Sequence, residues 1–278
     1  MVFQIGNFYY YLSIVVMLIL PIALYLLIRN KSQKTIKITL IAIAIFNFLL
    51  HFLKILHPSY LVDIKDSLVR MTPENICALS TIVLPFVMLM KKTALKGYLY
   101  LISFLGGLMA VIIIPQYMNG MKIYEFELVR YWTCHYILFM VPVVACLTKE
   151  YKPNYKHAIY MPLFFLAGQT IILLNELFIL KVGLIKYGTK EFFSPVIRNM
   201  SFVFGPNGSG GKLVDAFMFL VPKVFTKNVF GIEGVGDFYW PVVWLLFPTI
   251  IFFPIGYLVL TLPFTYKDIK NDIKRYIK

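Results

Sequence analysis

Long apolar stretches separated by short polar segments dominate the sequence. A helix that crosses the apolar part of a bilayer needs about 20 mostly apolar residues. Seven stretches meet this requirement, at about 8–28, 38–56, 72–90, 97–117, 128–147, 158–179 and 238–262. The pattern therefore predicts an all-α, polytopic membrane protein with about seven transmembrane helices.

The basic residues indicate which way the helices run. Residues 1–7 contain no lysine or arginine, so the first apolar stretch is interpreted as an uncleaved anchor rather than a secretory signal. Basic clusters follow the first, third, fifth and seventh stretches, near residues 29–37, 91–96, 149–156 and 267–278. Cytoplasmic loops are enriched in lysine and arginine, so we expect the N-terminus outside and the C-terminus inside.

No linker or internal repeat divides the chain, which predicts a single transmembrane helical domain over residues 1–278. One connection is unusually long, the expected external loop at about 180–237. Its run Val214–Phe225 has the pattern of a short amphipathic helix at the outer interface. The segment GPNGSGGK from Gly205 to Lys212 departs from a phosphate-binding loop at two required positions, so we interpret it as a flexible turn.

Composition excludes several classes of protein. With 60% hydrophobic and 14% charged residues, the chain has too little polar surface for a soluble globule of its size. The net charge of +14 lies in blocks beside apolar stretches, without the basic and aromatic interleaving of a nucleic-acid groove. Three scattered cysteines and four histidines form no recognised metal motif. We therefore expect no nucleic-acid partner, no metal and no cofactor.

Polar side chains within the predicted spans gather toward the expected outer ends of the helices. Such residues are costly in a bilayer and require a partner or a polar cavity. Their distribution predicts an outward-facing polar cavity, and single members could instead be satisfied by snorkelling or by a local bond. The candidates for substrate binding in this group are His51, Arg130, Gln169, Asn175 and Glu176; Asn47 and Lys54 lie on the same helix face as His51.

Cys77 and His135 are the pair best suited to covalent chemistry. They are predicted at similar depths on different helices. An imidazole that takes the thiol proton turns cysteine into a nucleophile for acyl transfer. Cys134 diverges from His135 by about 100° around the helix, and Cys146 is interpreted as a packing residue.

Four short motifs carry a resemblance to a known family: PENICALS at 73–80, RYWTCHYI at 130–137, NMSF at 199–202 and LPF at 262–264. In these motifs the chain resembles the YwaF-like integral membrane family, related to animal cysteine-dependent transmembrane phospholipid acyltransferases. The resemblance implies Cys77 as nucleophile and His135 as essential base, and it adds Asn199 to the substrate-binding candidates. Ala78 and Cys134 depart from the residues usual in those relatives, so the resemblance does not define a substrate.

Two functions remain open at this point. One is a membrane lipid acyltransferase or acyl hydrolase that uses the Cys/His pair, with a membrane lipid or its acyl chain as substrate. The other is a non-enzymatic transporter or binding protein for a small amphiphile, for which prolines in or near the spans would supply helix breaks. Lysine far outnumbers arginine, which favours a bacterial cytoplasmic membrane as the location.

Overall fold

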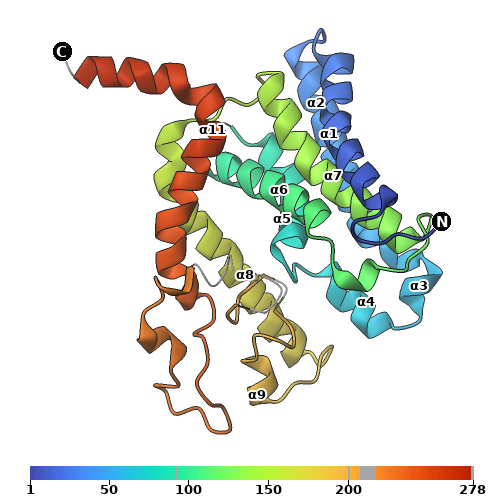
Figure 1. The fold of residues 1–278 in the computed structure, drawn as a ribbon, viewed down its shortest axis with the longest axis vertical. Helices are drawn as coiled ribbons and strands as arrows, with labels where there is room; N and C mark the ends of the chain where they lie inside the picture. The colour runs from blue at the N-terminus through green and yellow to red at the C-terminus, as the bar shows by residue number, and fades with distance from the viewer. Residues whose placement is uncertain (92, 200, 207–216, 277–278) are drawn as a thin grey trace. The chain divides into compact units, whose positions relative to one another are not determined.

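The protein is all-helical in its computed structural model, which describes residues 1–91, 93–199, 201–206 and 217–276 (Figure 1). No strand occurs in these ranges, so the predicted fold class is confirmed. The α-helices are, in chain order, α1 (Phe8–Ile28), α2 (Gln33–Leu53), α3 (Pro58–Leu61), α4 (Ile64–Met71), α5 (Ile76–Leu89), α6 (Ala94–Ile112), α7 (Phe126–Leu147), α8 (Met161–Lys181), α9 (Thr189–Phe192) and α11 (Leu246–Tyr276).

Six helical segments of the described chain are long and apolar enough to cross a membrane. Helices α4 and α5 together are also long and apolar enough, but they bend by 56° at the break between them. Counted as one broken span, they bring the total to seven. Many of the large apolar side chains on these helices are exposed, as expected for surfaces that face lipid. The prediction of about seven spans is confirmed, while the direction in which they cross stays a prediction.

Several helix boundaries differ from the windows that hydropathy suggests, most clearly at the third, fourth and seventh windows. The third window, 72–90, begins in the break between α4 and α5, where Thr72 is extended because Pro73 follows it. The helix of the fourth window, α6, ends at Ile112, shortly before Pro115. The helix of the seventh window, α11, begins at Leu246 instead of near residue 238, and it continues to Tyr276 through a polar end that lies beyond the apolar window.

The chain separates into two compact units. The first unit comprises Met1–Leu56, Ser80–Asn154 and Phe264–Lys278, and the second comprises His57–Leu79 and Tyr155–Pro263. Helices α5 and α11 each contribute residues to both units. Whether the whole chain behaves as a single domain therefore stays a prediction.

The first unit is a bundle in which α7 packs against α1, α2 and α6 (Figure 1). α6 and α7 approach each other closely at Gly107. A Cβ atom at this position would lie 2.6 Å from the carbonyl oxygen of His135 and 2.6 Å from the backbone nitrogen of Phe139. The missing side chain of Gly107 therefore allows two helix backbones to meet beside His135.

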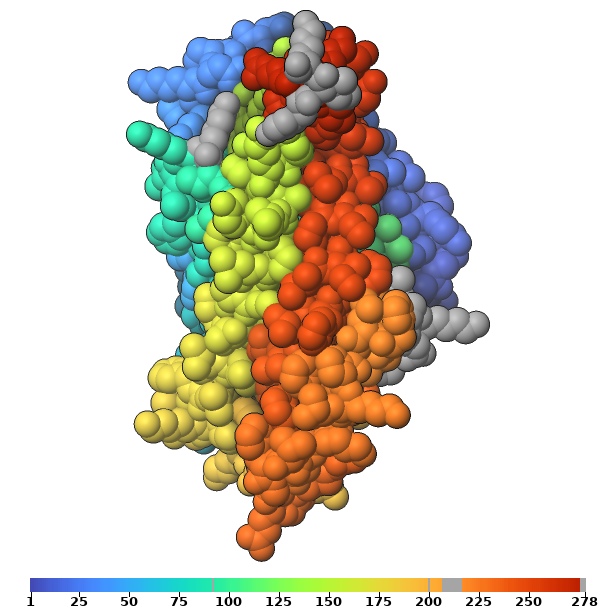
Figure 2. Space-filling model, turned by 90° about the vertical axis from the view of Figure 1, so that its left-hand side faces the viewer, coloured from blue at the N-terminus to red at the C-terminus, as the bar shows by residue number. Residues whose placement is uncertain are grey.

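In the second unit, α8 lies beside the first part of α11, where the rings of Phe165 and Phe253 are 4.1 Å apart (Figures 1 and 2). The long connection after α8 is packed rather than loose over much of its described length. Val203 and Phe204 are buried against Ile172 of α8, and the indole nitrogen of Trp244 donates to the carbonyl of Phe202 at 2.9 Å. Its position outside the membrane stays a prediction.

Two sequence features fall partly outside the described residues. Of the GPNGSGGK segment the structure describes Gly205 and Pro206, and of the expected interfacial helix Val214–Phe225 it describes the part from residue 217 onward. Within that part, residues 223–226 form a short 3-10 helix.

Candidate functional site

The predicted site residues belong to both units of the fold. His51, Arg130 and His135 lie in the first unit, whereas Cys77 and Asn199 lie in the second. The second unit also holds the three polar candidates of α8, which are Gln169, Asn175 and Glu176. The local surroundings of each residue determine what it can do chemically.

His135 on α7 is held in one orientation by its own helix. Its ring nitrogen Nδ1 lies 2.7 Å from the carbonyl oxygen of Tyr131, one turn earlier. A carbonyl can only accept, so Nδ1 carries the hydrogen and Nε2 of the neutral ring keeps its lone pair. The Tyr131 ring lies tilted against the imidazole, with 4.2 Å between the two ring centroids. The hydroxyl of Tyr131 donates to the carbonyl of Ala110 at 2.9 Å. This arrangement leaves Nε2 able to act as a base.

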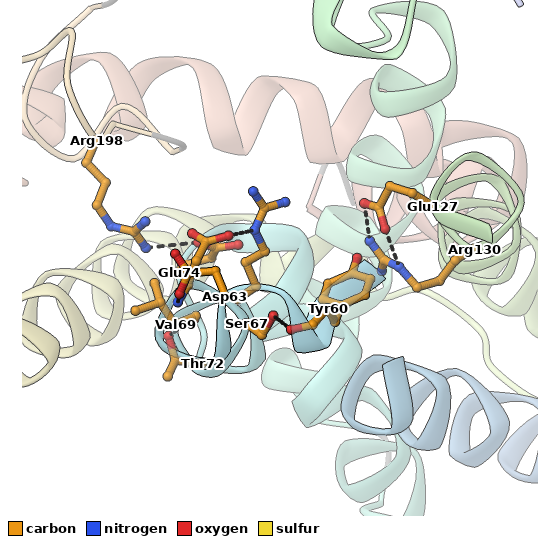
Figure 3. Close-up of polar contacts among 11 residues, drawn as sticks. Tyr60, Asp63, Ser67, Val69, Thr72, Glu74, Glu127, Arg130 and Arg198 are labelled. Atoms are coloured by element: carbon orange, nitrogen blue, oxygen red, sulfur yellow. Dashed lines mark hydrogen bonds and ion pairs between the residues drawn. The ribbon is translucent and has the colours of Figure 1, made fainter. Parts of the chain in front are cut away.

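Arg130, which precedes His135 by five residues, forms a two-pronged ion pair with Glu127. Its Nε donates to one carboxylate oxygen at 3.0 Å, and its Nη2 donates to the other at 2.6 Å (Figure 3). Both side chains are partly buried. Glu127 thus offsets much of the positive charge that Arg130 would offer to a phosphate or an oxyanion.

The polar face of α2 is buried, as expected for side chains that share one side of a helix. Asn47 and His51 are 1% and 5% exposed, and Lys54, just beyond the helix end, is 4% exposed. The Asn47 amide donates to the carbonyl of Cys134 at 3.3 Å, so it joins α2 to α7. Within the described chain, the amide oxygen of Asn47 is buried without a hydrogen-bond partner. Such an oxygen could accept a hydrogen bond from a ligand.

Cys77 is the second residue of α5 and is partly exposed. Two side chains fix this first turn of the helix. The carbonyl oxygen of the Asn75 side chain accepts from the backbone N–H of Ala78 at 2.8 Å, and the hydroxyl of Ser201 accepts from the N–H of Ile76 at 2.8 Å. Cys77 therefore lies in the first turn of α5, at the positive end of its helix dipole.

Close to Cys77 in sequence, Glu74 takes part in a mostly buried ionic cluster with Arg198 and Glu176. Nη2 of Arg198 donates to Glu74 at 2.9 Å (Figure 3), and its Nε donates to Glu176 at 2.8 Å. Burial alone would lower the pKa of Arg198, but the hydrogen bonds and charges of the two carboxylates raise it above its usual value. The cluster joins α8 to the start of α5 through a residue of the connection after α8.

The other two polar candidates of α8, Asn175 and Gln169, differ in whether their side chains have hydrogen-bond partners among the described residues. The Asn175 amide donates to the hydroxyl of Thr72 at 2.9 Å, next to the break before α5. Gln169 is 1% exposed, and its side-chain oxygen has no hydrogen-bond partner among the residues described. Gln169 is therefore the α8 residue best placed to accept from a bound polar group.

Asn199 organises the backbone of the NMSF segment. Its amide nitrogen donates to the carbonyls of Pro195 and Gly205 at 3.0 and 2.6 Å, and its oxygen accepts from the N–H of Phe204 at 3.1 Å. Asn199 is itself buried. These contacts indicate that it shapes the loop that presents Ser201 to α5.

Sequence reasoning did not identify several polar partners of the candidates. Glu127, Thr72, Glu74, Ser201 and Arg198 all lie outside the apolar windows or at their edges, where a charged or hydroxyl side chain carries no signal. The available hints were in the motifs, since Glu74 belongs to PENICALS, Ser201 belongs to NMSF, and Arg198 directly precedes NMSF. Across the described ranges, no group of three or more His, Cys, Asp or Glu side chains is arranged to hold a metal ion.

Comparison with known proteins gives one match. The sequence profile of the TMEM164 family matches residues 3–257, nearly the whole chain. No curated protein and no solved structure matches the chain.

Proposed function

The chain belongs to the TMEM164 family, and we propose that it is a membrane enzyme that removes an acyl group from a lipid ester. The acyl group would then pass to a second alcohol or to water. The proposal includes the kinship with cysteine-dependent phospholipid acyltransferases suggested by the sequence motifs, and a bacterial cytoplasmic membrane as the location.

The observation that carries the proposal is the fixed tautomer of His135. A general base must keep its lone pair on the nitrogen that faces the nucleophile, and the bond from Nδ1 to the Tyr131 carbonyl leaves that role to Nε2. Cys77 supplies the nucleophile at the positive end of α5. The proposal requires the Cys77 sulfur to come within hydrogen-bond reach of Nε2.

The reaction has two steps. The thiol proton of Cys77 moves to Nε2 of His135 while the sulfur attacks the ester carbonyl, and the leaving alcohol takes that proton as the thioester forms. His135 then removes a proton from the acceptor alcohol or water, which attacks the thioester and restores the thiol. Gln169, Asn47 and His51 are the candidates to hold polar parts of the lipid, and Arg198 and Asn199 act as positioning residues.

The test uses the purified chain in nanodiscs with a phospholipid that carries a fluorescent acyl chain. Release or transfer of the acyl group is measured for the wild type, Cys77→Ala, His135→Gln and the control Cys146→Ala, which removes the partly exposed cysteine near the end of α7. The first two variants should lose about 100-fold or more in rate, and the control should retain it. Full activity of Cys77→Ala would reject the proposed Cys/His enzyme. Lipid binding without turnover in the wild type and in all three variants would favour a carrier.

A further inference from the structure

Most exposed cations of the first unit gather at the polar end of its helix bundle. They come from the α1–α2 turn, the end of α7 and the last turns of α11. In Figure 2 the α1–α2 turn and the end of α11 both lie at the top. We call this group the basic surface; its members are Arg29, Lys31, Lys34, Lys149, Lys267, Lys270, Lys274 and Arg275.

Side-chain bonds hold the three segments of the basic surface together. The Gln33 amide at the start of α2 donates to the carbonyl of Thr148 at the end of α7, at 3.1 Å. Lys152 pairs with Asp268 of α11 at 2.5 Å. The cations are therefore displayed on a supported surface rather than on separate tails.

Few acidic residues balance these cations. Within residues 29–37, 149–152 and 264–275 the acidic residues are Glu150, Asp268 and Asp272. Glu150 is already paired with the buried Lys96 at 3.1 Å, and Asp268 with Lys152. The basic surface therefore keeps a strong positive charge for an external partner.

The last turns of α11 separate charge from apolar side chains in a regular way. Tyr266, Ile269 and Ile273 follow the i, i+3, i+7 spacing of one helix face, and Tyr266 and Ile273 are 57% and 52% exposed. The residue after each is a lysine, so Lys267, Lys270 and Lys274 form a parallel row beside the apolar face. Asp268 and Asp272 lie on the side of the helix away from this lysine row.

We infer that this basic surface binds the phosphate groups of anionic phospholipids in the leaflet at this end of the bundle. An apolar face flanked by lysines fits the interface between headgroups and acyl chains, where each lysine adds attraction to an anionic leaflet. A soluble polyanion would leave the apolar face uncovered. The inference does not depend on the proposed catalysis.

The test compares two spin-labelled lipids, phosphatidylglycerol and phosphatidylcholine, around the full chain reconstituted in phosphatidylcholine vesicles. The measured quantity is the ratio of their association constants, taken from the motionally restricted fraction of each. We expect the wild type to prefer phosphatidylglycerol. The variant Lys267→Gln, Lys270→Gln, Lys274→Gln should lose about fivefold or more of this preference, and salt should weaken it in the wild type.

Two control variants separate surface charge from net charge and from misfolding. Lys186→Gln, Lys190→Gln, Lys223→Gln removes the same charge from exposed positions of the second unit and should keep the preference. Replacing the same three α11 lysines by arginine should also keep it. An equal loss in the second-unit control, an unchanged preference in the α11 glutamine variant, or displacement of the labelled lipid by millimolar inorganic phosphate would overturn the inference.

Discussion

Arg198 shows how one side chain can organise a polar region inside a mostly apolar protein. It lies between two carboxylates, those of Glu74 and Glu176, and all three side chains are at most 15% exposed. Removal of one member of a buried ionic group leaves the charges of the others without compensation, which costs more than the pair contributes when intact.

Arg198→Leu should therefore destabilise the protein more than Glu74→Gln. We expect a loss of about 3–5 kcal/mol for the arginine variant, since two carboxylates remain buried, and a smaller loss for Glu74→Gln, where Glu176 still binds Arg198. Thermal unfolding in detergent measures both. Equal stability of Arg198→Leu and the wild type would mean that the cluster is solvated in the membrane protein.

Asp237 provides a pH-dependent contact on the connection after α8. The hydrogen bond from Lys227 and that from the backbone N–H of Asn228 lower the pKa of this exposed carboxyl below its usual value. A lowered folded pKa stabilises the loop above the unfolded pKa of about 4, and this stabilisation is lost as the pH falls through the folded pKa.

Cleavage within residues 227–237 by an acid protease that stays active from pH 3 to 6 tests this contact. The wild type should be cut more slowly than Asp237→Asn at pH 5 to 6, and the two rates should converge as the pH falls through the lowered folded pKa of Asp237. Comparison at each pH removes the pH dependence of the protease itself. A constant ratio of the two rates would exclude a role for the Asp237 charge.

At the scale of elements, hydropathy predicts where the helices lie but not where they bend or which polar partners they use. The windows of α1 and α7 agree closely with the helices. The break before α5 was foreseeable from Pro73, which a window average conceals. The helical end of α11 was not, because a polar helix end produces no apolar window.

α6 and α7 lie close together at Gly107, and Gly107→Ala should weaken this contact. The added methyl group would lie 2.6 Å from backbone atoms of α7, so the helices must separate at a cost of about 1–3 kcal/mol. Gly256→Ala on α11 is the matched control, since its Cβ meets nothing within 4 Å and alanine favours helix. The thermal unfolding temperature should fall for Gly107→Ala and should hold or rise for Gly256→Ala. The reverse order of the two variants would refute the close contact.

For the whole molecule, sequence pattern could predict membrane insertion and the residues worth testing, but not their assembly. Asn47 and His51 were expected to share a helix face, and both are buried. Cys77 and His135 were chosen because their predicted depths match, and a depth does not determine which helices are neighbours. The partners of Glu176 and Arg130, which are Arg198 and Glu127, depend on local geometry that charge counts do not contain.

The predicted topology can be tested with reporters at two positions of the chain. A reporter fused after Lys278 should be cytoplasmic, because the basic clusters favour that side, and one inserted near Ser209 should be external. Fusions should keep the chain folded, as judged by size-exclusion elution. An external C-terminus would reverse the predicted depths of all the polar residues.

The pairing of Cys77 with His135 is tested most directly by the mass of the covalent intermediate. After incubation with a phospholipid in nanodiscs, the protein is quenched in acid, digested and analysed by mass spectrometry for an acyl group on the peptide that contains Cys77. We predict a hydroxylamine-sensitive adduct on Cys77 in the wild type and in Cys146→Ala, and a strong decrease of this adduct in His135→Gln because no base takes the thiol proton. An adduct that forms equally in His135→Gln, or that lies on Cys134 or Cys146 instead, would contradict the proposed pair.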